Sequence, residues 1–361
     1  MMDGLALQGL SRPLRVGLVG LGKMGLLHAG ILSRIPGVTI GGVCDKDPAL
    51  RHGLRCLGVD ANAYTEVAQM VHRERLEVLF VCTPTSSHLP IAKEALGQAP
   101  GLAIYVEKPL AESLPSALEL LSLCRQRSVP SGVGYMLVAK PVYRTLKQLL
   151  GEGAIGTVSR VEASVMLSEV ARRRSGWRYD RNQAGGGALI EIGSHLLAVV
   201  EWLFGPPCTV SAVTLPPEEW SEDEASLRIQ YAAGPQIDVA CSRSTAGYPL
   251  LSMQMVFSGD RGKLKASDEE LFLWEGGEHW RVVDRRTFPL SPAFDMGGEA
   301  FYLHDLEFLE SVADPRRAFS MPWRRGAAVQ AIIAAAYAAA RAGGTGQAVQ
   351  GIEAGEDSAG R

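Results

Sequence analysis

A glycine pattern close to the start of the chain constrains the fold more than any other feature. The apolar run 16–19 leads into the segment Gly20–Gly25 (GLGKMG), and a helical spacing of apolar residues follows it as far as Pro36. A strand, a G-x-G-x-x-G turn and a helix in this order form the phosphate-binding unit of doubly wound α/β folds. The first glycine allows the tight turn, the second lets the backbone approach a pyrophosphate, and the third lets the helix pack on the strand. The sequence therefore predicts an anion site at a helix N-terminus.

The first 135 residues alternate strand-like and helical segments. Strand-like runs at 16–19, 38–44, 78–82, 103–106 and 132–136 are separated by helical patterns, with a further short strand near 63–64. This alternation implies right-handed crossovers and a parallel sheet covered on both faces. Asp45 ends the second strand about 20 residues after Gly25, where a carboxylate accepts hydrogen bonds from ribose hydroxyls and repels a 2′-phosphate. We therefore predict a Rossmann domain over 1–135 that binds NAD in preference to NADP, although Lys46 weakens that preference.

The pattern changes after residue 135. Helical segments at 141–150 and 187–204 are followed by strand-like runs at 209–213, 226–231, 236–242, 251–257 and 262–266, after an earlier one at 158–166. Two helices at 299–312 and 325–341 close this part of the chain. We predict a second α/β domain over 136–342 with a large, open, mostly antiparallel sheet, and a flexible tail over 343–361 because that stretch is rich in glycine and polar residues.

Length, charge and cysteine spacing exclude several classes of protein. A chain of 361 residues suits two domains, and its net charge of −3 provides no basic surface for nucleic acid. The six cysteines form no C-x-x-C pair, so no metal site is expected. The chain shows no export signal, and its apolar helical stretch at 327–340 is too short to span a membrane. A cytoplasmic protein without a membrane partner is expected.

Four motifs together resemble the glucose–fructose oxidoreductase, inositol dehydrogenase and rhizopine-catabolism family (Gfo/Idh/MocA). They are the glycine loop 20–25, Thr83-Pro84 with His88 beyond it, Glu107-Lys108-Pro109, and the segment 185–195 (GGGALIEIGSH). The resemblance covers nearly the whole chain, from about residue 15 to 341. It implies a Rossmann domain, a C-terminal α/β domain with an open sheet, and a tightly held nicotinamide cofactor. It also implies sugar, polyol or nucleotide-sugar substrates, and homodimers or homotetramers formed through the sheet.

The resemblance also implies roles for individual residues. Lys108 matches the family's catalytic-site lysine, with a bond to Pro109 that is often cis, and His195 matches its acid/base histidine. Glu191 stands where the family usually has aspartate, and Ala198 stands where aspartate is also frequent. The segment 136–140 (MLVAK), usually polar and basic, is mostly apolar here. These departures suggest a substrate that is less polar than a plain sugar, or one that is held differently.

The residue chemistry supports the same roles. Oxidising a secondary alcohol requires a base near neutrality, for which histidine is the natural choice. Glu191 and His195 are spaced i, i+4, so on an α-helix the carboxylate would orient the imidazole, unless the two are an ordinary surface pair. Lys108 would donate a hydrogen bond to the substrate oxygen, although a solvated surface lysine is the alternative.

These arguments give a complete set of expected site residues. The catalytic residues are Lys108, His195 and Glu191. The cofactor contacts are Gly20, Leu21, Gly22, Lys23, Met24, Asp45, Thr83, Pro84, Thr85, His88, Glu107 and Lys108. The substrate contacts are Tyr135, Arg178, Asn182, His195 and His304. For His88 a packed structural role is an equal alternative, and the loop around Arg178 is either a polar binding site or a solvated surface.

The sequence therefore predicts an NAD-dependent oxidoreductase that transfers a hydride between nicotinamide and a secondary hydroxyl or ketone of a sugar, polyol or sugar nucleotide. Two alternatives stay open. One is an NAD-using glycoside hydrolase, which would release a free sugar without net NADH. The other is a non-catalytic nucleotide-sensing regulator, against which the presence of both Lys108 and His195 argues.

Overall fold

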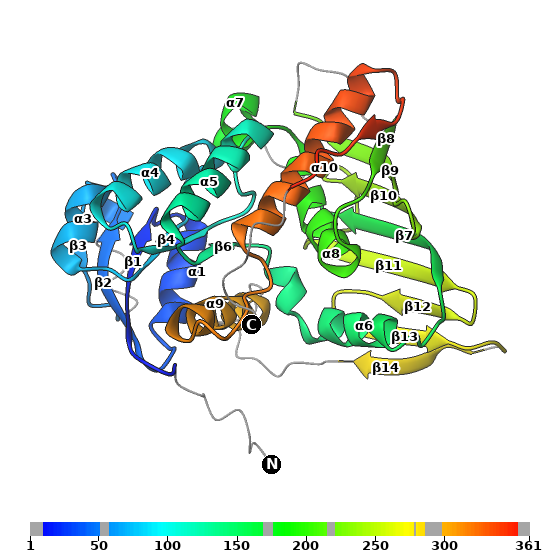
Figure 1. Cartoon of the computed structure of the whole chain (residues 1–361), viewed down its shortest axis with the longest axis horizontal. Coiled ribbons are helices and arrows are strands. Elements are labelled where there is room, and N and C mark those ends of the chain that lie inside the picture. Colours follow the sequence, from blue (N-terminus) through cyan, green and yellow to red (C-terminus); the bar gives the residue numbers. More distant parts are fainter. Residues whose placement is uncertain are drawn as a thin grey trace, which may run out of the picture.

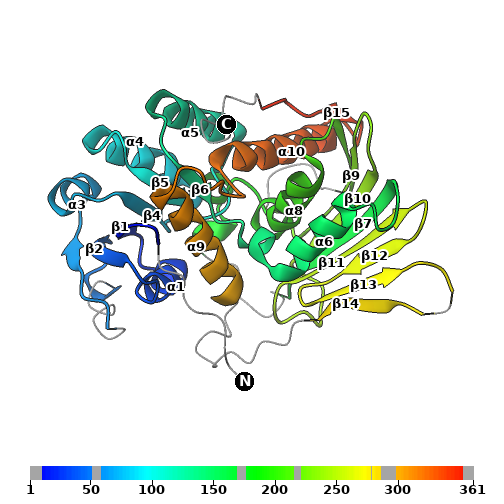
Figure 2. The same cartoon turned by 60° about the horizontal axis from the view of Figure 1, so that its bottom comes forward.

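The structure, a computed structural model, describes residues 10–50, 58–168, 176–214, 221–277, 279–285 and 298–352. Its two β-sheets lie side by side, with a group of helices between them (Figures 1 and 2). The first sheet belongs to an N-terminal Rossmann domain and the second to a C-terminal domain, so the predicted fold class is confirmed. The helical segment expected from residue 48 continues into 51–57, which lie outside the described residues.

The Rossmann sheet has six parallel strands in the order β3-β2-β1-β4-β5-β6. Its strands are β1 (Leu14–Val19), β2 (Val38–Cys44), β3 (Asn62–Tyr64), β4 (Val78–Val81), β5 (Ala103–Val106) and β6 (Ser131–Val133). The helices between them are α1 (Lys23–Leu32), α3 (Val67–Glu74), α4 (His88–Gln98) and α5 (Leu114–Arg127). The order reverses at β1 and β4, and ligands of such sheets bind beyond the carboxyl ends of the strands at this point.

Side chains of the central strands alternate between two buried layers. Leu79 on β4 belongs to the layer covered by α3, α4 and α5, whereas the next residue, Phe80, belongs to the layer covered by α1. The second layer also contains Phe308 of helix α9 (Gly298–Ala313), which comes from the far end of the chain. Strands buried on both faces read as continuous apolar runs, which is why β4 and β5 were readily predicted.

The second sheet has nine strands in the order β14-β13-β12-β11-β7-β10-β9-β8-β15, and only β7 and β10 pair in parallel. The strands are β7 (Val158–Met166), β8 (Thr209–Thr214), β9 (Glu224–Gln230), β10 (Gln236–Ser242), β11 (Ser252–Gly259), β12 (Lys263–Ala266), β13 (Glu270–Trp274), β14 (Arg281–Arg285) and β15 (Gln347–Ala348). Helices α6 (Pro141–Gly151), α8 (Ser194–Phe204) and α10 (Trp323–Arg341) cover the face toward the Rossmann domain (Figures 1 and 2). In the part of the chain that the structure describes, no helix covers the other face.

The structure differs from the sequence prediction in three places. Strands β13 and β14 were not predicted. The predicted helix 187–204 contains a π-helical segment at Leu189–Gly193 before α8 begins. The stretch from residue 343 was expected to be loose, yet β15 pairs with β8, and the Val349 N–H donates to the Cys208 carbonyl at 2.9 Å. A sheet edge offers unpaired backbone groups to any neighbouring segment, whatever its side chains. Residues 353–361 lie outside the described part.

Among the described residues, one helical run, Arg181–Phe204, is long and apolar enough to cross a membrane by length and composition alone. In its most apolar window, 83% of the residues are buried inside the fold. The run therefore contributes its apolar side chains to the protein core.

Candidate functional site at the carboxyl edge of the Rossmann sheet

The glycine loop has the geometry that a phosphate-binding turn requires. Gly20 has a φ of +86°, and a Cβ on it would lie 2.7 Å from the Thr83 methyl group. A Cβ on Gly25 would overlap the Gly20 carbonyl oxygen, so only glycine lets α1 pack this closely. Around Gly22, by contrast, no heavy atom lies within 4 Å of the Cβ position. The turn and the helix packing therefore leave the middle glycine open to a ligand.

The neighbouring groups fit a dinucleotide as well. None of the described side chains caps the N-terminus of α1, so its first N–H groups are available to an anion. Lys23 is exposed and Met24 is half-buried beside this loop. The Thr85 hydroxyl, just beyond β4, is buried and has no hydrogen-bond partner among the residues described. A buried hydroxyl without a partner indicates a group that a ligand completes.

Asp45 lies against the glycine loop. One carboxylate oxygen accepts a hydrogen bond from the Leu21 N–H at 2.6 Å, and the other accepts one from the Asp47 N–H at 2.8 Å. The residue that was predicted to contact the ribose therefore also fixes the loop that was predicted to hold the pyrophosphate. This second contact was not predicted.

His88 occupies a buried position behind the Thr83-Pro84-Thr85 turn. Its two ring nitrogens lie 3.2 Å from the Leu110 carbonyl oxygen and 3.1 Å from the Thr83 carbonyl oxygen. The side chain is only 1% exposed, and burial lowers the pKa of its imidazole. Of the two roles considered for His88, these contacts favour the packed one, in which it joins two loops of the Rossmann domain.

Lys108 follows β5 at the same edge of the sheet. Its peptide bond to Pro109 is cis, as the resemblance implied. The Lys108 Nζ donates to the backbone carbonyl of Glu191 at 2.8 Å, which ties the two domains together. An ammonium group carries three donors, and the other two have no partner among the described residues. Burial lowers the pKa of this amine, although Glu191 and Glu107 oppose the shift.

His195 begins α8 and lies within the electrostatic influence of Lys108. Burial, reinforced by the positive charge of Lys108, holds the pKa of His195 well below its usual value. The imidazole is therefore neutral at physiological pH. Its Nδ1 has no hydrogen-bond partner in the described part of the chain, and the same is true of the buried Tyr135 hydroxyl. The two rings lie edge to face, with centroids 6.1 Å apart.

Glu191 does not contact His195, contrary to the prediction. Its carboxylate accepts a hydrogen bond from Arg243 Nη1 at 2.9 Å and pairs with Arg178 Nε at 3.5 Å. The prediction assumed α-helical geometry, in which residues i and i+4 share a face. Leu189–Gly193 instead form a π-helical turn, and the Glu191 carboxylate is held by the two arginines.

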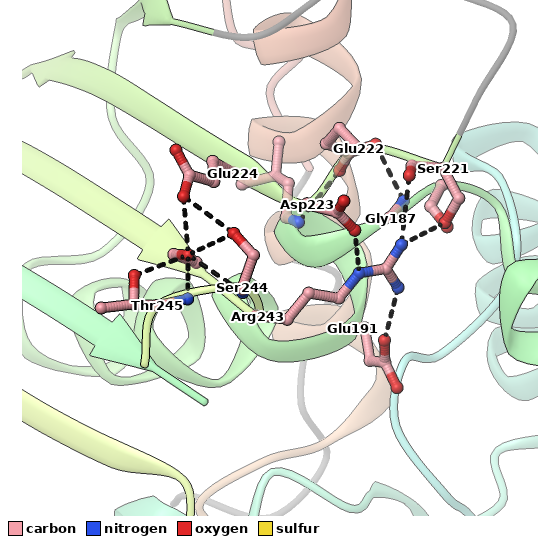
Figure 3. A network of polar contacts seen from close by, with 12 residues as sticks. Gly187, Glu191, Ser221, Glu222, Asp223, Glu224, Arg243, Ser244 and Thr245 are labelled. Atoms are coloured by element: carbon pink, nitrogen blue, oxygen red, sulfur yellow. Dashed lines mark hydrogen bonds and ion pairs between the residues drawn. The ribbon is translucent and has the colours of Figure 1, made fainter. Parts of the chain in front are cut away.

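Arg243 is the centre of a polar network that sequence reasoning missed (Figure 3). Its side chain is 2% exposed, and its Nε donates to Asp223 at 3.0 Å. Its Nη2 donates to the Ser221 hydroxyl at 2.9 Å. Arg243 directly follows β10, and a charged residue at the end of an alternating strand was the only signal in the sequence. Nothing in the spacing connects residue 243 with residue 191.

Glu222 fixes the start of the segment that carries Glu191 and His195. Its carboxylate accepts hydrogen bonds from the Gly187 N–H at 2.9 Å and the Leu189 N–H at 3.0 Å (Figure 3). A Cβ on Gly187 would overlap the Glu222 backbone oxygen. The glycines before Ala188 therefore let this segment lie directly against the backbone of Glu222, just before β9.

Glu107 holds a buried histidine instead of facing the glycine loop. Its Oε2 accepts a hydrogen bond from the Lys108 N–H at 3.1 Å, and its Oε1 lies 2.9 Å from His28 Nε2. His28 Nδ1 lies 2.7 Å from Asp305 on α9. This His28–Glu107–Asp305 cluster connects α1, the turn before Lys108, and α9.

Two other residues that were predicted to contact the substrate, Asn182 and His304, lie in different surroundings. Asn182 is exposed on the short helix α7 (Arg181–Ala184), which packs against residues 85–87 of the Rossmann domain. His304 is fully buried, with its Nδ1 3.0 Å from the Tyr105 hydroxyl and its ring 4.8 Å from Phe319. Helix α9 turns this face toward the Rossmann sheet, so His304 packs there against the rings of Tyr105 and Phe319.

Comparison with known proteins identifies the family. Residues 14–135 match the family model described as an oxidoreductase family with an NAD-binding Rossmann fold, and residues 143–265 match the GFO/IDH/MocA C-terminal domain. The chain belongs to the Gfo/Idh/MocA family. Its N-terminal part is the NAD-binding Rossmann fold of that oxidoreductase family, as the sequence predicted.

Individual relatives are distant. The chain is 28% identical to the inositol 2-dehydrogenase of Corynebacterium glutamicum strain R over 54% of its own length and 56% of that protein's. It is also 28% identical to the trans-1,2-dihydrobenzene-1,2-diol dehydrogenase of Oryctolagus cuniculus, over 64% and 67%. Among the first curated relatives, the matched share of their length runs from 41% to 67%. A solved levoglucosan dehydrogenase in complex with NADH and levoglucosan has the same fold, with a TM-score of 0.84, 22% identity, and coverage of 94% of this chain and 100% of that one.

Proposed function

We propose that this protein is an NAD-dependent dehydrogenase that transfers a hydride between nicotinamide and a secondary hydroxyl or ketone of a sugar, polyol or sugar nucleotide. The observation that carries the proposal is the hydrogen bond by which Lys108 reaches the segment that carries His195. Lys108 comes from the Rossmann domain and His195 from the C-terminal domain. The Lys108 amine donates a hydrogen bond to the backbone carbonyl of Glu191, which comes about one helical turn before His195, and its charge acts on the His195 imidazole. Relatives named as inositol and dihydrodiol dehydrogenases support the same class of substrate.

The open glycine loop, the uncapped start of α1 and Thr85 would hold the dinucleotide, and Asp45 would contact its adenosine ribose. A bound nicotinamide supplies the hydride acceptor for alcohol oxidation. A carboxylate at position 45 repels a 2′-phosphate, so we propose NAD as the preferred form.

Two side chains at the edge of the sheet would handle the proton and the charge of the substrate oxygen. The neutral imidazole of His195 accepts the hydroxyl proton as the alcohol becomes a ketone. The Lys108 ammonium donates one of its free N–H groups to the substrate oxygen and stabilises the negative charge that develops there. In the reductive direction, the same groups act in reverse.

Unpaired polar atoms around these two residues support a hydroxylated substrate. The Tyr135 hydroxyl and His195 Nδ1 are both buried and have no hydrogen-bond partner among the described residues. Leaving a buried polar group without a partner costs about 1–3 kcal/mol. A ligand with several hydroxyl groups would recover part of that free energy.

The experiment is a substrate panel with a matched pair of lysine variants. Purified enzyme is given NAD⁺ with polyols, aldoses, sugar acids and nucleotide sugars, and the appearance of NADH absorbance is followed. Lys108→Ala should lower kcat by about 10²–10³-fold with NAD affinity retained, because the alkoxide loses its donor. Lys147→Ala is the control, since Lys147 on α6 also donates to a backbone carbonyl, that of Trp202, at 2.7 Å.

Three outcomes would contradict the proposal. Near-normal kcat in Lys108→Ala would remove the role of the amine. Release of a free sugar without net NADH would indicate glycoside cleavage. NAD binding by calorimetry with no turnover across the panel would indicate a nucleotide-sensing protein.

We also propose a homodimer or homotetramer formed through the nine-stranded sheet. The face of that sheet that points away from the Rossmann domain carries no described helix, which supports this arrangement (Figures 1 and 2).

A further inference from the structure

Arg178 presents an unused guanidinium beside the candidate site. Its Nε pairs with Glu191 at 3.5 Å, and its guanidinium carbon lies 5.1 Å from the centre of the Trp177 ring. Neither of its Nη groups has a partner in the described part of the chain, and the side chain is 50% exposed. The guanidinium is therefore held at one nitrogen and one face, while its two outer nitrogens remain free to bind a ligand.

The carboxylate that holds Arg178 is itself fixed by a buried arginine. Arg243, which is 2% exposed, donates to Glu191 at 2.9 Å and to Asp223 at 3.0 Å (Figure 3). Glu191 thus uses one oxygen for the buried arginine and offers the other to Arg178. A binding group that is already fixed loses less entropy when its ligand binds. The contacts from Arg243 through Glu191 therefore hold Arg178 in place before the substrate binds.

The same arrangement places Arg178 near the reacting groups. The Glu191 backbone carbonyl accepts the hydrogen bond from Lys108, and the charge of Arg178 contributes to lowering the pKa of Lys108. An anion that contacted Arg178 would therefore lie on the same side of the protein as the Lys108 amine.

We propose that the substrate carries a carboxylate, and that Arg178 binds it. This inference rests on the proposed dehydrogenase function and narrows its substrate class to sugar acids such as uronates and aldonates. A guanidinium binds a planar carboxylate through two parallel N–H···O bonds, and two free Nη groups suit that geometry. Glu191, which does not orient the base, acts here as a positioning residue for Arg178.

The test compares substrates that differ only at one carbon. D-Glucose, D-glucuronate and D-glucose 6-phosphate form one series, and D-galactose with D-galacturonate forms another, each assayed with NAD⁺ for kcat and KM. The uronates should be preferred by at least about tenfold in kcat/KM. A hydrogen bond to a charged group contributes about 1.5–3 kcal/mol, so Arg178→Gln should raise KM for a uronate roughly 10- to 150-fold. KM for the neutral sugar should change less than about twofold, and kcat should change little in either case.

Arg144→Gln is the matched control. Arg144 lies on α6, is 43% exposed and pairs with Glu307 at 2.7 Å, so it is another half-exposed arginine held by a glutamate. This variant should leave KM unchanged for every substrate. Glu191→Gln should raise KM for the uronate by a smaller factor than Arg178→Gln, because the guanidinium stays but loses its anchor.

The outcomes separate this inference from the proposed function. Equal or better use of neutral sugars, or an equal effect of Arg178→Gln on both kinds of substrate, would overturn the inference and leave the dehydrogenase function in place. A preference for the phosphorylated sugar would also overturn it. If no sugar of either kind is oxidised although NAD binds, the proposed function fails. In that case, titration of the uronates into the enzyme–NADH complex decides the inference, and the absence of binding heat overturns it.

Discussion

His28 provides a direct test of how buried charge contributes to the stability of this fold. Its imidazole has no exposed surface and lies between two carboxylates, Asp305 at 2.7 Å and Glu107 at 2.9 Å. Burial alone lowers the pKa of His28, but the two carboxylates outweigh it and raise the value from 6.5 to about 10. His28 is therefore a permanent cation in the folded protein at physiological pH.

The sign of the pH dependence follows from that shift. A group whose pKa is raised on folding adds stability that is complete below its unfolded pKa of 6.5 and is lost as the pH rises through about 10. Between these values the folded state binds one proton more than the unfolded state at this residue. Each pH unit in the interval therefore removes about 1.4 kcal/mol, or roughly 2.7 kcal/mol between about pH 7.5 and about pH 9.5.

The perturbation is His28→Gln, which keeps an amide donor and removes the charge. At the lower pH the variant should be less stable by about 3–5 kcal/mol, because two carboxylates stay buried without their cation. That deficit should narrow by about 1.4 kcal/mol per pH unit as the wild type loses the contribution of His28. Urea unfolding followed by circular dichroism at several pH values measures both quantities.

The control is His72→Gln, because His72 is an exposed histidine at the end of α3. Taking the difference between variant and wild type removes the contribution of cysteines and lysines that titrate in the same range. A deficit for His28→Gln that stays constant from the lower to the higher pH would refute the reasoning. The reasoning would also be refuted if the stability deficit of His72→Gln changed with pH by as much as the deficit of His28→Gln.

Two further predictions concern the cofactor. Gly22→Val should abolish NAD binding in a calorimetric titration, because the branched side chain would occupy the path of the phosphates. The melting temperature should stay nearly unchanged, because the Cβ position is open to solvent. Normal binding would mean that the phosphates lie elsewhere. Asp45→Ala should reduce the preference for NAD over NADP in the ratio of kcat/KM values, because the 2′-phosphate is no longer repelled; an unchanged ratio would show that another residue reads the ribose.

Local patterns in the sequence determined the Rossmann domain and its binding edge. Strand, glycine turn and helix follow one another within a few residues, and Asp45, Thr83 and Lys108 each come within two residues of the end of a strand. Because parallel strands end at one edge of their sheet, a residue that follows a strand is placed by that fact alone. The family resemblance implied that Lys108 and His195 act together, and in the structure Lys108 donates to the backbone carbonyl of Glu191, four residues before His195.

Only the tertiary structure decided the contacts of Glu191 and the place of α9. The Glu191 carboxylate binds Arg178 and Arg243, and no periodicity in the sequence indicates these contacts or the π-helical turn at Leu189–Gly193. Helix α9 returns from residue 298 to cover the Rossmann sheet and pair Asp305 with His28. Sequence patterns record which face of a segment is buried, but not which distant segment covers it, because many apolar surfaces are equally acceptable partners until the whole chain packs.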